Sequence, residues 1–232
     1  MNAIILAAGM GTRLRPLTNE MPKCLVPVLG IPIVERQIQF LHEAGIRDIT
    51  LVSGYRAEKL SFLIEKYGVR IVYNERYDTC NNIYSLYKVL DVFGDTWVVE
   101  GDVYMQMNCF TTNIRSSAYY AKWHRHYERE WGLECDTNGK LINIHIGNGQ
   151  GCIMSGISYW NRNDAKLIAD EIRDIINSGD YTNLFWDEAV VHLYKRMNIE
   201  VKAFNYIHEI DTEKELTKLE QKLRNDNERN NI

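Results

Sequence analysis

The stretch LAAGMGTRL, residues 6–14, decides the fold. A short apolar run from Ala3 to Ala7 predicts a buried strand that ends at Gly9. Glycines two positions apart let the backbone turn sharply and bring its N–H groups close to phosphate oxygens. Arg13 in the turn and Lys23 beyond it supply cations that a phosphate would need. The stretch therefore predicts a strand that leads into a phosphate-binding turn.

Two other phosphate-binding loops do not match this stretch. The P-loop pattern G-x-x-x-x-G-K-[ST] is absent from the chain. Gly9 and Gly11 begin a dinucleotide-binding fingerprint, but Leu14 stands where its third glycine would be. The remaining alternative is an ordinary tight turn between a strand and a helix, whose basic residues are surface charges.

Strand and helix signals alternate over the first hundred residues. Further strands are expected at 48–53, 69–73 and 96–100, and helices at 32–44, 56–67 and 82–90. Strands that alternate with helices at this pace are typical of parallel crossovers in a layered α/β sheet.

The second half of the chain has more strand signals. Strands are expected at 118–123, 131–135, 140–146, 152–160 and 199–204, and helices at 163–178, 184–197 and 212–225. Asn138-Gly139 predicts a hairpin turn between two of these strands. The glycine-rich stretch from Gly147 to Gly151 is expected to be a loop.

Composition excludes several classes of protein. The 232 residues carry a formal net charge of -4, so no basic surface for nucleic acid is expected. The five cysteines never form a C-x-x-C pair, which argues against a disulfide framework and a zinc site. No run approaches the roughly 18 apolar residues of a membrane span. We expect a cytoplasmic enzyme with reduced thiols that acts on small molecules.

Two acidic residues follow apolar strands. Asp102 comes directly after the strand at 96–100, and Asp211 follows the apolar residues before the last helix. Ligands of open α/β sheets bind at the carboxyl ends of strands, and Mg²⁺ prefers carboxylate and phosphate oxygens. Both acids are therefore candidate metal ligands. The alternatives are a turn-forming aspartate at 102 and a helix N-cap at 211.

The motif L-A-A-G-x-G-x-R-x-x-P-x-T, followed by P-K, resembles the signature of the sugar-phosphate nucleotidyltransferase superfamily. The full chain resembles the bacterial CTP:phosphocholine cytidylyltransferases. The segments that carry this second resemblance are 73–75, 81–87, 130–131, 155–160, 186–187 and 209–211.

The resemblance implies one α/β domain with the three-layer, Rossmann-like nucleotidyltransferase fold, in which helices flank a mixed central sheet. A nucleotide-binding part would span about 1–115 and an acceptor-binding part about 116–210, followed by the helix at 212–225. The implied reaction transfers CMP from CTP to phosphocholine, requires Mg²⁺, and gives CDP-choline and pyrophosphate. No nucleic acid or membrane partner is implied, and the chain would be a monomer or homodimer.

Other functions stay open at this level. The acceptor could be phosphoethanolamine or 2-aminoethylphosphonate, and a sugar-1-phosphate nucleotidyltransferase would share the same turn and acids. A non-catalytic nucleotide-binding module is the alternative outside enzymes. It is disfavoured because Arg13, Lys23, Asp102 and Asp211 are all present.

The resemblance also assigns roles to particular residues. Arg13 and Lys23 would be catalytic, and Asp102 and Asp211 would bind Mg²⁺. The nucleotide would contact Leu6, Ala8, Gly9, Gly11, Gly54, Tyr55, Asn81 and Asn82. A quaternary ammonium is recognised by aromatic faces and a nearby carboxylate, which would come from Trp131, Trp160, Trp186 and Asp187. The alternative for the aromatic rings is packing in the core.

Overall fold

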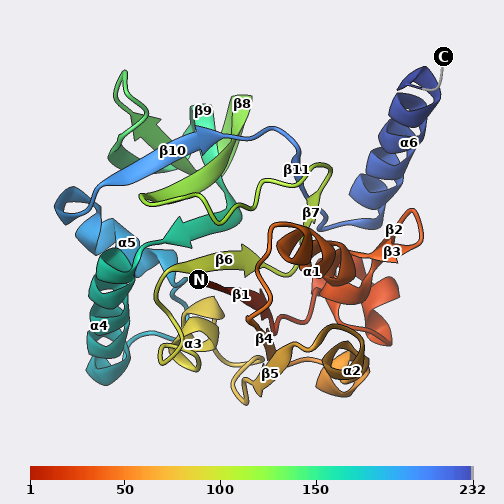
Figure 1. The fold of residues 1–232 in the computed structure, drawn as a ribbon, viewed down its shortest axis with the longest axis horizontal. Coiled ribbons are helices and arrows are strands. Elements are labelled where there is room, and N and C mark those ends of the chain that lie inside the picture. The colour runs from red at the N-terminus through yellow and green to blue at the C-terminus, as the bar shows by residue number, and fades with distance from the viewer. Residues whose placement is uncertain (231–232) are drawn as a thin grey trace.

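A mixed seven-stranded sheet forms the centre of the protein, whose computed structural model describes residues 1–230 (Figure 1). From one edge to the other its strands are β10 (Ile199–Ala203), β8 (Ser117–Cys135), β9 (Leu141–Trp160), β6 (Thr96–Glu100), β1 (Asn2–Ala7), β4 (Ile49–Ser53) and β5 (Arg70–Tyr73). Strands β6, β1, β4 and β5 are parallel, and β9 runs antiparallel to its neighbours β6 and β8. The predicted α/β fold with a mixed sheet is confirmed.

Helices cover both faces of this sheet. They are α1 (Ile33–Glu43), α2 (Phe62–Tyr67), α3 (Asn82–Tyr87), α4 (Arg162–Ser178), α5 (Asp187–Leu193) and α6 (Glu213–Asn230). Short 3₁₀ turns are η1 (Thr12–Leu14), η2 (Leu17–Asn19), η3 (Lys23–Leu25), η4 (Ala57–Leu60) and η5 (Tyr194–Arg196). Three helices are shorter than the sequence predicts, since η4 precedes α2, η5 follows α5, and α3 ends at Tyr87. Within residues 1–230, no helix combines the length and apolar character needed to cross a bilayer.

Strand β1 is buried on both faces, as a central parallel strand should be. Ile4 and Leu6 pack in the core beneath α3, α4 and α5, whereas Ala3, Ile5 and Ala7 pack beneath α1 and α2. This alternation follows from the two-residue period of a strand. It fixes the strand in the middle of the sheet, so the turn that follows it opens at the sheet's carboxyl edge.

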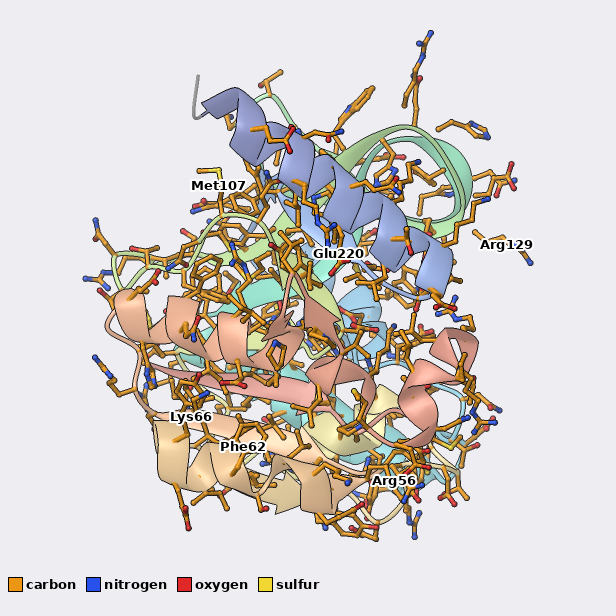
Figure 2. The ribbon with its side chains drawn as sticks, turned by 90° about the vertical axis from the view of Figure 1, so that its right-hand side faces the viewer. Arg56, Phe62, Lys66, Met107, Arg129 and Glu220 are labelled. Atoms are coloured by element: carbon orange, nitrogen blue, oxygen red, sulfur yellow. The ribbon has the colours of Figure 1, made fainter. Side chains whose placement is uncertain are left out.

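Two small antiparallel sheets lie outside the central one, and of their strands the sequence predicted only the one before Asp211. Strand β2 (Pro27–Val28) pairs with β3 (Ile31–Pro32), and β7 (Val103–Met105) pairs with β11 (Ile207–Glu209). Helix α6 follows β11 and crosses one side of the molecule (Figure 2). Its buried leucines pack in a third apolar cluster with Leu14, Val26 and Val28. Glu220 on the same helix accepts a hydrogen bond from the Leu29 backbone N–H at 2.7 Å.

The prediction of a loop at Gly147–Gly151 is wrong. These residues lie within β9, which pairs with β8 through several shifts of register. The Tyr127 ring explains one glycine of this stretch, because a Cβ at Gly149 would lie only 2.6 Å from its hydroxyl. Glycine is therefore needed where an aromatic ring lies against the strand. The two short strands predicted at 118–123 and 131–135 are likewise one continuous β8.

The close approach of β6 to β1 places Asp102 beside the glycine turn. The Gly101 N–H donates to the Leu6 carbonyl at 2.8 Å. A Cβ at Gly101 would lie 2.8 Å from the Ala7 Cβ, which is closer than real side chains approach. A glycine here therefore lets the end of β6 contact β1 directly.

Replacement of Gly101 by alanine should separate the two strand ends. We expect Gly101→Ala to lower the free energy of unfolding by about 1–3 kcal/mol, as overpacking of a filled interior does. The matched control is Gly94→Ala at the other end of β6, where a Cβ would meet its nearest atom, in Arg162, at 3.9 Å. The control should change stability by less than about 0.5 kcal/mol. Urea unfolding measures both, and equal losses would contradict the steric explanation.

Candidate active site

Two adjoining cavities open at the carboxyl edge of the sheet. The first has a volume of about 340 Å³ and the second about 460 Å³. Residues on the wall that they share are Arg13, Asn82, Glu100, Asp102, Phe185 and Asp211. A ligand in the first cavity would therefore lie against a ligand in the second.

The glycine turn after β1 lines the first cavity and fixes the position of Lys23. Gly11 adopts a left-handed conformation with φ of 59°. A Cβ on this residue would lie 2.9 Å from the Lys23 Cβ, so only glycine lets the lysine stem pack against the turn. The Thr18 hydroxyl donates to the Gly11 carbonyl at 2.8 Å and ties the turn to η2. Gly11 is therefore needed because any larger residue would collide with the Lys23 side chain.

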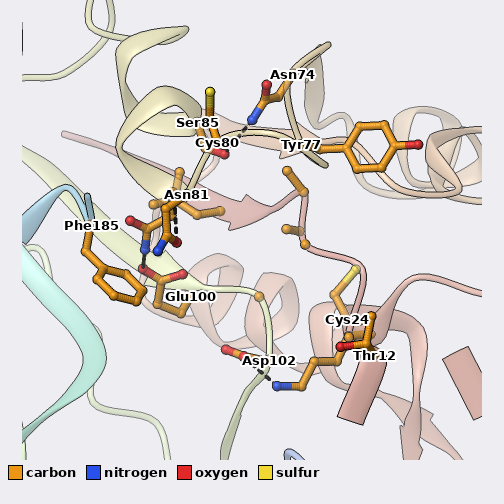
Figure 3. A pocket seen from close by; sticks show the side chains of 18 of the residues that line it. Thr12, Cys24, Asn74, Tyr77, Cys80, Asn81, Ser85, Glu100, Asp102 and Phe185 are labelled. Atoms are coloured by element: carbon orange, nitrogen blue, oxygen red, sulfur yellow. Dashed lines mark hydrogen bonds and ion pairs between the residues drawn. The ribbon is translucent and has the colours of Figure 1, made fainter. Parts of the chain in front are cut away.

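Four charged side chains from distant parts of the chain meet at the shared wall: Arg13, Asp102 and Asp211 line both cavities, and Lys23 lines the first. The Lys23 ammonium lies 2.6 Å from an oxygen of Asp102 and 2.6 Å from an oxygen of Asp211. The Arg13 guanidinium lies 2.9 Å from the same Asp211 oxygen. Burial alone would lower the pKa of Lys23, but the two carboxylates outweigh it and raise that pKa above its ordinary value. Lys23 therefore stays protonated at neutral pH. Figure 3 shows the ion pair at Asp102.

The β7–β11 pairing carries Asp211 to this cluster. Glu209 of β11 lies opposite Val103, the residue that follows Asp102. The helix N-cap alternative for Asp211 is wrong, because Thr212 caps α6: its hydroxyl accepts from the Glu215 N–H at 3.3 Å. The Glu215 carboxylate in turn accepts from the Thr212 N–H at 2.9 Å, which completes a capping box. The Asp211 side chain is thereby left to face Lys23.

The carboxylate pair suits a magnesium ion. Both oxygens contact the same Lys23 nitrogen, so one small cation can reach both. Among residues 1–230 no group of three His, Cys, Asp or Glu side chains converges as a metal site. Mg²⁺ is usually bound by one or two carboxylates together with phosphate oxygens and waters. The donor set of Asp102 and Asp211 fits that mode of binding when a phosphorylated ligand is present.

Small polar side chains form the far wall of the first cavity (Figure 3). Asn74 donates to the Ser85 hydroxyl at 2.9 Å, and Tyr77 lies beside them. Leu6, Ala8, Gly9, Gly11, Asn81 and Asn82, which the sequence proposed as nucleotide contacts, also line this cavity. Sequence reasoning missed Asn74, Tyr77 and Ser85, although Asn74 follows a predicted strand and could have been noticed for that reason.

The prediction that Gly54 and Tyr55 line the cavity is wrong. Tyr77 packs on Gly54, where a Cβ would lie 2.5 Å from the Tyr77 Cβ, and so stands between this turn and the cavity. The Tyr55 hydroxyl points elsewhere and donates to the Asn19 carbonyl at 3.0 Å. Both residues support the wall from behind, because the Tyr55 N–H also holds the Ala8 carbonyl at 3.0 Å.

The second cavity is rich in carboxylates and aromatic rings. Besides Asp102 and Asp211, its lining includes the acids Glu100, Glu130, Asp187 and Glu209 and the rings of Tyr119, Trp131, Phe185 and Trp186. Trp131 and Phe185 meet edge to face, with their ring centroids 6.1 Å apart. Sequence reasoning proposed Trp131, Trp186 and Asp187 here, but missed the other acids and Phe185.

These carboxylates are held in an environment that disfavours their charge. Burial raises the pKa of Asp187 to about 7, although a hydrogen bond from the Tyr119 hydroxyl at 2.7 Å opposes the shift. Burial, followed by the charges of Asp102, Glu130 and Asp211, raises the pKa of Glu209 to about 7. A cation in the second cavity would relieve this repulsion, and the acids outnumber the two arginines of the lining, Arg13 and Arg129.

The prediction that Trp160 contacts a substrate is wrong. Its side chain is 0% exposed and lies in the core. Its ring packs edge to face on Trp186 and Tyr119, with centroid distances of 5.9 and 5.3 Å. Trp160 therefore supports the residues that line the cavity and touches no ligand itself.

Comparisons with known proteins agree with this geometry. The family described as nucleotidyl transferase matches residues 2–124, just over half of the chain. A choline-phosphate cytidylyltransferase from Streptococcus pneumoniae is 40% identical over 98% of this chain and 100% of its own length. A 2-aminoethylphosphonate cytidylyltransferase from Lancefieldella rimae is 34% identical, over 93% of this chain and 90% of its own.

A solved structure gives the same result for the fold. The CTP:phosphocholine cytidylyltransferase of Streptococcus pneumoniae superimposes with a TM-score of 0.93 at 40% identity, covering 96% of this chain and 98% of the other. Sequence and structure thus agree over nearly the whole length of both proteins. This chain belongs to the nucleotidyl transferase family.

Proposed function

We propose that this protein transfers CMP from CTP to phosphocholine, forming CDP-choline and releasing pyrophosphate. The observation that carries the proposal is the ion cluster in which Lys23, a lining residue of the first cavity, contacts Asp102 and Asp211 on the wall shared by the two cavities. The glycine turn lines the first cavity, and carboxylates and aromatic rings line the second. The named activity of the Streptococcus pneumoniae relative supports CTP as donor and phosphocholine as acceptor.

The reaction requires two anions to meet. A phosphate oxygen of the acceptor forms a bond to the α-phosphorus of CTP, and the bond from that phosphorus to the leaving pyrophosphate breaks. The protein contributes positioning and neutralisation of charge, since no covalent enzyme intermediate is needed. Lys23, with its side chain only 12% exposed, is placed to contact the α-phosphate and the attacking oxygen. Arg13 is 73% exposed and free to move onto the β- and γ-phosphates.

We further propose that Asp102 and Asp211 hold Mg²⁺ in the loaded enzyme. The ion would supply charge neutralisation at the phosphates when it is bound. In the structure Lys23 neutralises both carboxylates. Mg²⁺ would bind the same oxygens as the Lys23 ammonium, so the two cations would compete for Asp102 and Asp211, and Lys23 would then be available to the substrate phosphates.

The second cavity fits the cationic head of the acceptor. A trimethylammonium group donates no hydrogen bonds and is stabilised by aromatic faces and nearby negative charge. Trp131, Phe185 and Trp186 supply the rings, and Asp187 supplies a carboxylate. The acidic lining would also bind a primary ammonium, and the Lancefieldella rimae relative is named for 2-aminoethylphosphonate. That compound is the second candidate acceptor.

We also infer a cytoplasmic location. All five cysteines are free in the structure, as is usual for proteins of a reducing compartment.

A pyrophosphate-release assay tests the proposed reaction. CTP, UTP, ATP and dTTP are each offered with phosphocholine, phosphoethanolamine, 2-aminoethylphosphonate and glucose-1-phosphate. The highest kcat/KM is expected for CTP with phosphocholine, and excess EDTA should abolish turnover because the carboxylates then lack their ion. Preference for another acceptor would overturn the substrate assignment, and full activity in EDTA would overturn the metal assignment.

Replacement of Lys23 should separate catalysis from metal binding. Lys23→Ala is expected to lower kcat at least about a hundredfold, the scale of losing one preorganised donor to a developing charge. The same variant should bind Mn²⁺ more tightly than wild type, since the competing ammonium is gone. Steady-state kinetics and calorimetry measure the two effects.

The control for this variant is Lys59→Ala, which removes an exposed lysine from η4. It should change neither kcat nor the Mn²⁺ affinity. Wild-type turnover in Lys23→Ala would exclude a catalytic role for this lysine. Unchanged or weaker Mn²⁺ binding would exclude the competition.

The charge of Asp187 should make acceptor binding depend on pH. Its pKa of about 7 means that the carboxylate is mostly charged at pH 8 and mostly neutral at pH 6. Asp187→Asn should therefore raise the KM for phosphocholine about tenfold at pH 8 but only about twofold at pH 6. Initial rates of both enzymes at both pH values measure this ratio. Since the substrate titrates equally in the two assays, a ratio independent of pH would show that the carboxylate charge plays no part.

A further inference from the structure

Glu100, the last residue of β6, lies on the wall that both cavities share. One of its carboxylate oxygens accepts two hydrogen bonds. The Asn82 side-chain amide donates at 2.9 Å, and the Trp186 indole N–H donates at 3.3 Å. Asn82 lines both cavities, whereas Trp186 lines only the second. A single oxygen atom of Glu100 thus connects Asn82 on the shared wall with Trp186 in the second cavity. Figure 3 shows Glu100 from the side of the first cavity.

A further hydrogen bond closes this network. The Trp186 backbone N–H donates to the Asn82 side-chain carbonyl at 2.9 Å. Asn82 begins α3, and Trp186 immediately precedes α5, so the bonds join two helix starts that are far apart in the sequence. Next to them, the Asn81 N–H donates to the Thr182 carbonyl at 2.7 Å. The segment before α5 is therefore held on the start of α3, with Glu100 between them.

The stem of Glu100 is itself fixed by packing. Gly156 of β9 lies against it, and a Cβ on that glycine would be 2.9 Å from the Glu100 Cβ and 3.0 Å from its Cγ. Gly156 has φ of 70°, a conformation that glycine adopts without strain. The carboxylate therefore reaches Asn82 and Trp186 from a side chain with little freedom to move.

We propose that Glu100 is a positioning residue. Its shared hydrogen bonds hold the Trp186 ring in place for the acceptor substrate, and this ring in turn aligns the acceptor substrate with the nucleotide. The role rests on the proposed function and adds to it a residue that contacts other side chains instead of the reacting atoms. Misplacement of a reacting group by about 1 Å can cost a hundredfold in rate, so such alignment has a large effect. This role requires an oxygen atom at the end of the side chain that accepts hydrogen bonds from Asn82 and Trp186.

Two substitutions of nearly equal size test that role. Glu100→Gln keeps an oxygen that accepts hydrogen bonds at the same place but removes the negative charge. Glu100→Met keeps the length but leaves the Asn82 and Trp186 donors without a partner. Glu100→Met is expected to raise the KM for phosphocholine at least about tenfold, and Glu100→Gln less than about threefold.

KM is the chosen readout because a fraction of misfolded enzyme would lower kcat but leave KM unchanged. An unchanged KM for phosphocholine in Glu100→Met would overturn the proposal. A tenfold rise in Glu100→Gln would also overturn it, since charge would then be the property that matters. That second result decides the question even if Glu100→Met fails to fold.

A double substitution tests whether Glu100 acts through Trp186. Trp186→Phe removes the indole N–H and keeps an aromatic ring. If Glu100 positions that ring, adding Glu100→Met to Trp186→Phe should raise the KM less than Glu100→Met does alone, because interacting residues are not additive. If the two substitutions raise the KM by fully additive amounts, Glu100 does not act through Trp186.

The proposed reaction and the role of Glu100 can fail separately. If wild type prefers another acceptor in the pyrophosphate-release assay, the substrate assignment is wrong. The variants are then compared with the acceptor that wild type uses, and the role of Glu100 stands or falls on their KM values for it.

Discussion

The ammonium group of Lys23 holds the site together. It contacts the carboxylates of Asp102 and Asp211, which follow strands β6 and β11 and lie about a hundred residues apart in the chain, each at 2.6 Å. Two carboxylates this close would repel one another without a cation between them. Gly11 makes the contact possible by admitting the lysine stem, and Gly101 does so by letting β6 reach β1. The position of every other residue in the cleft is set relative to this pair.

Charge is distributed unevenly between the two cavities. Lys23 and Arg13 lie beside the glycine turn, where a triphosphate brings negative charge. Carboxylates dominate the second cavity, where the acceptor brings a cation. The protein as a whole carries a net charge of only -4, so recognition depends on local placement and not on a global field. In the proposed complex, a zwitterionic acceptor would span the boundary, with its phosphate toward Lys23 and its ammonium toward Asp187.

The buried acids lower the stability of the folded protein. Burial, together with the charges of Asp102 and Asp187, raises the pKa of Glu100 well above its ordinary value. Burial also raises the pKa values of Asp187 and Glu209 to about 7. Groups that would be more stable in water are retained at functional sites because a ligand stabilises them on binding. Cationic ligands would therefore stabilise the folded protein as well as fill the cavity. The shared hydrogen bonds of Glu100 show how such an acid can also fix its neighbours.

The sequence by itself determined the layered α/β fold, the glycine turn and the identity of the central charges, because these depend on local patterns. Apolar runs of period two, glycines at fixed spacing and acids at strand ends can all be read along the chain. Only the tertiary structure decided which aromatic rings face a ligand. Trp160 and Trp186 both lie in the core, with exposures of 0% and 3%, yet only Trp186 also lines a cavity. It also decided that Tyr77 covers Gly54 and that Glu100 joins two walls, since contacts between distant segments depend on how the sheet brings them together.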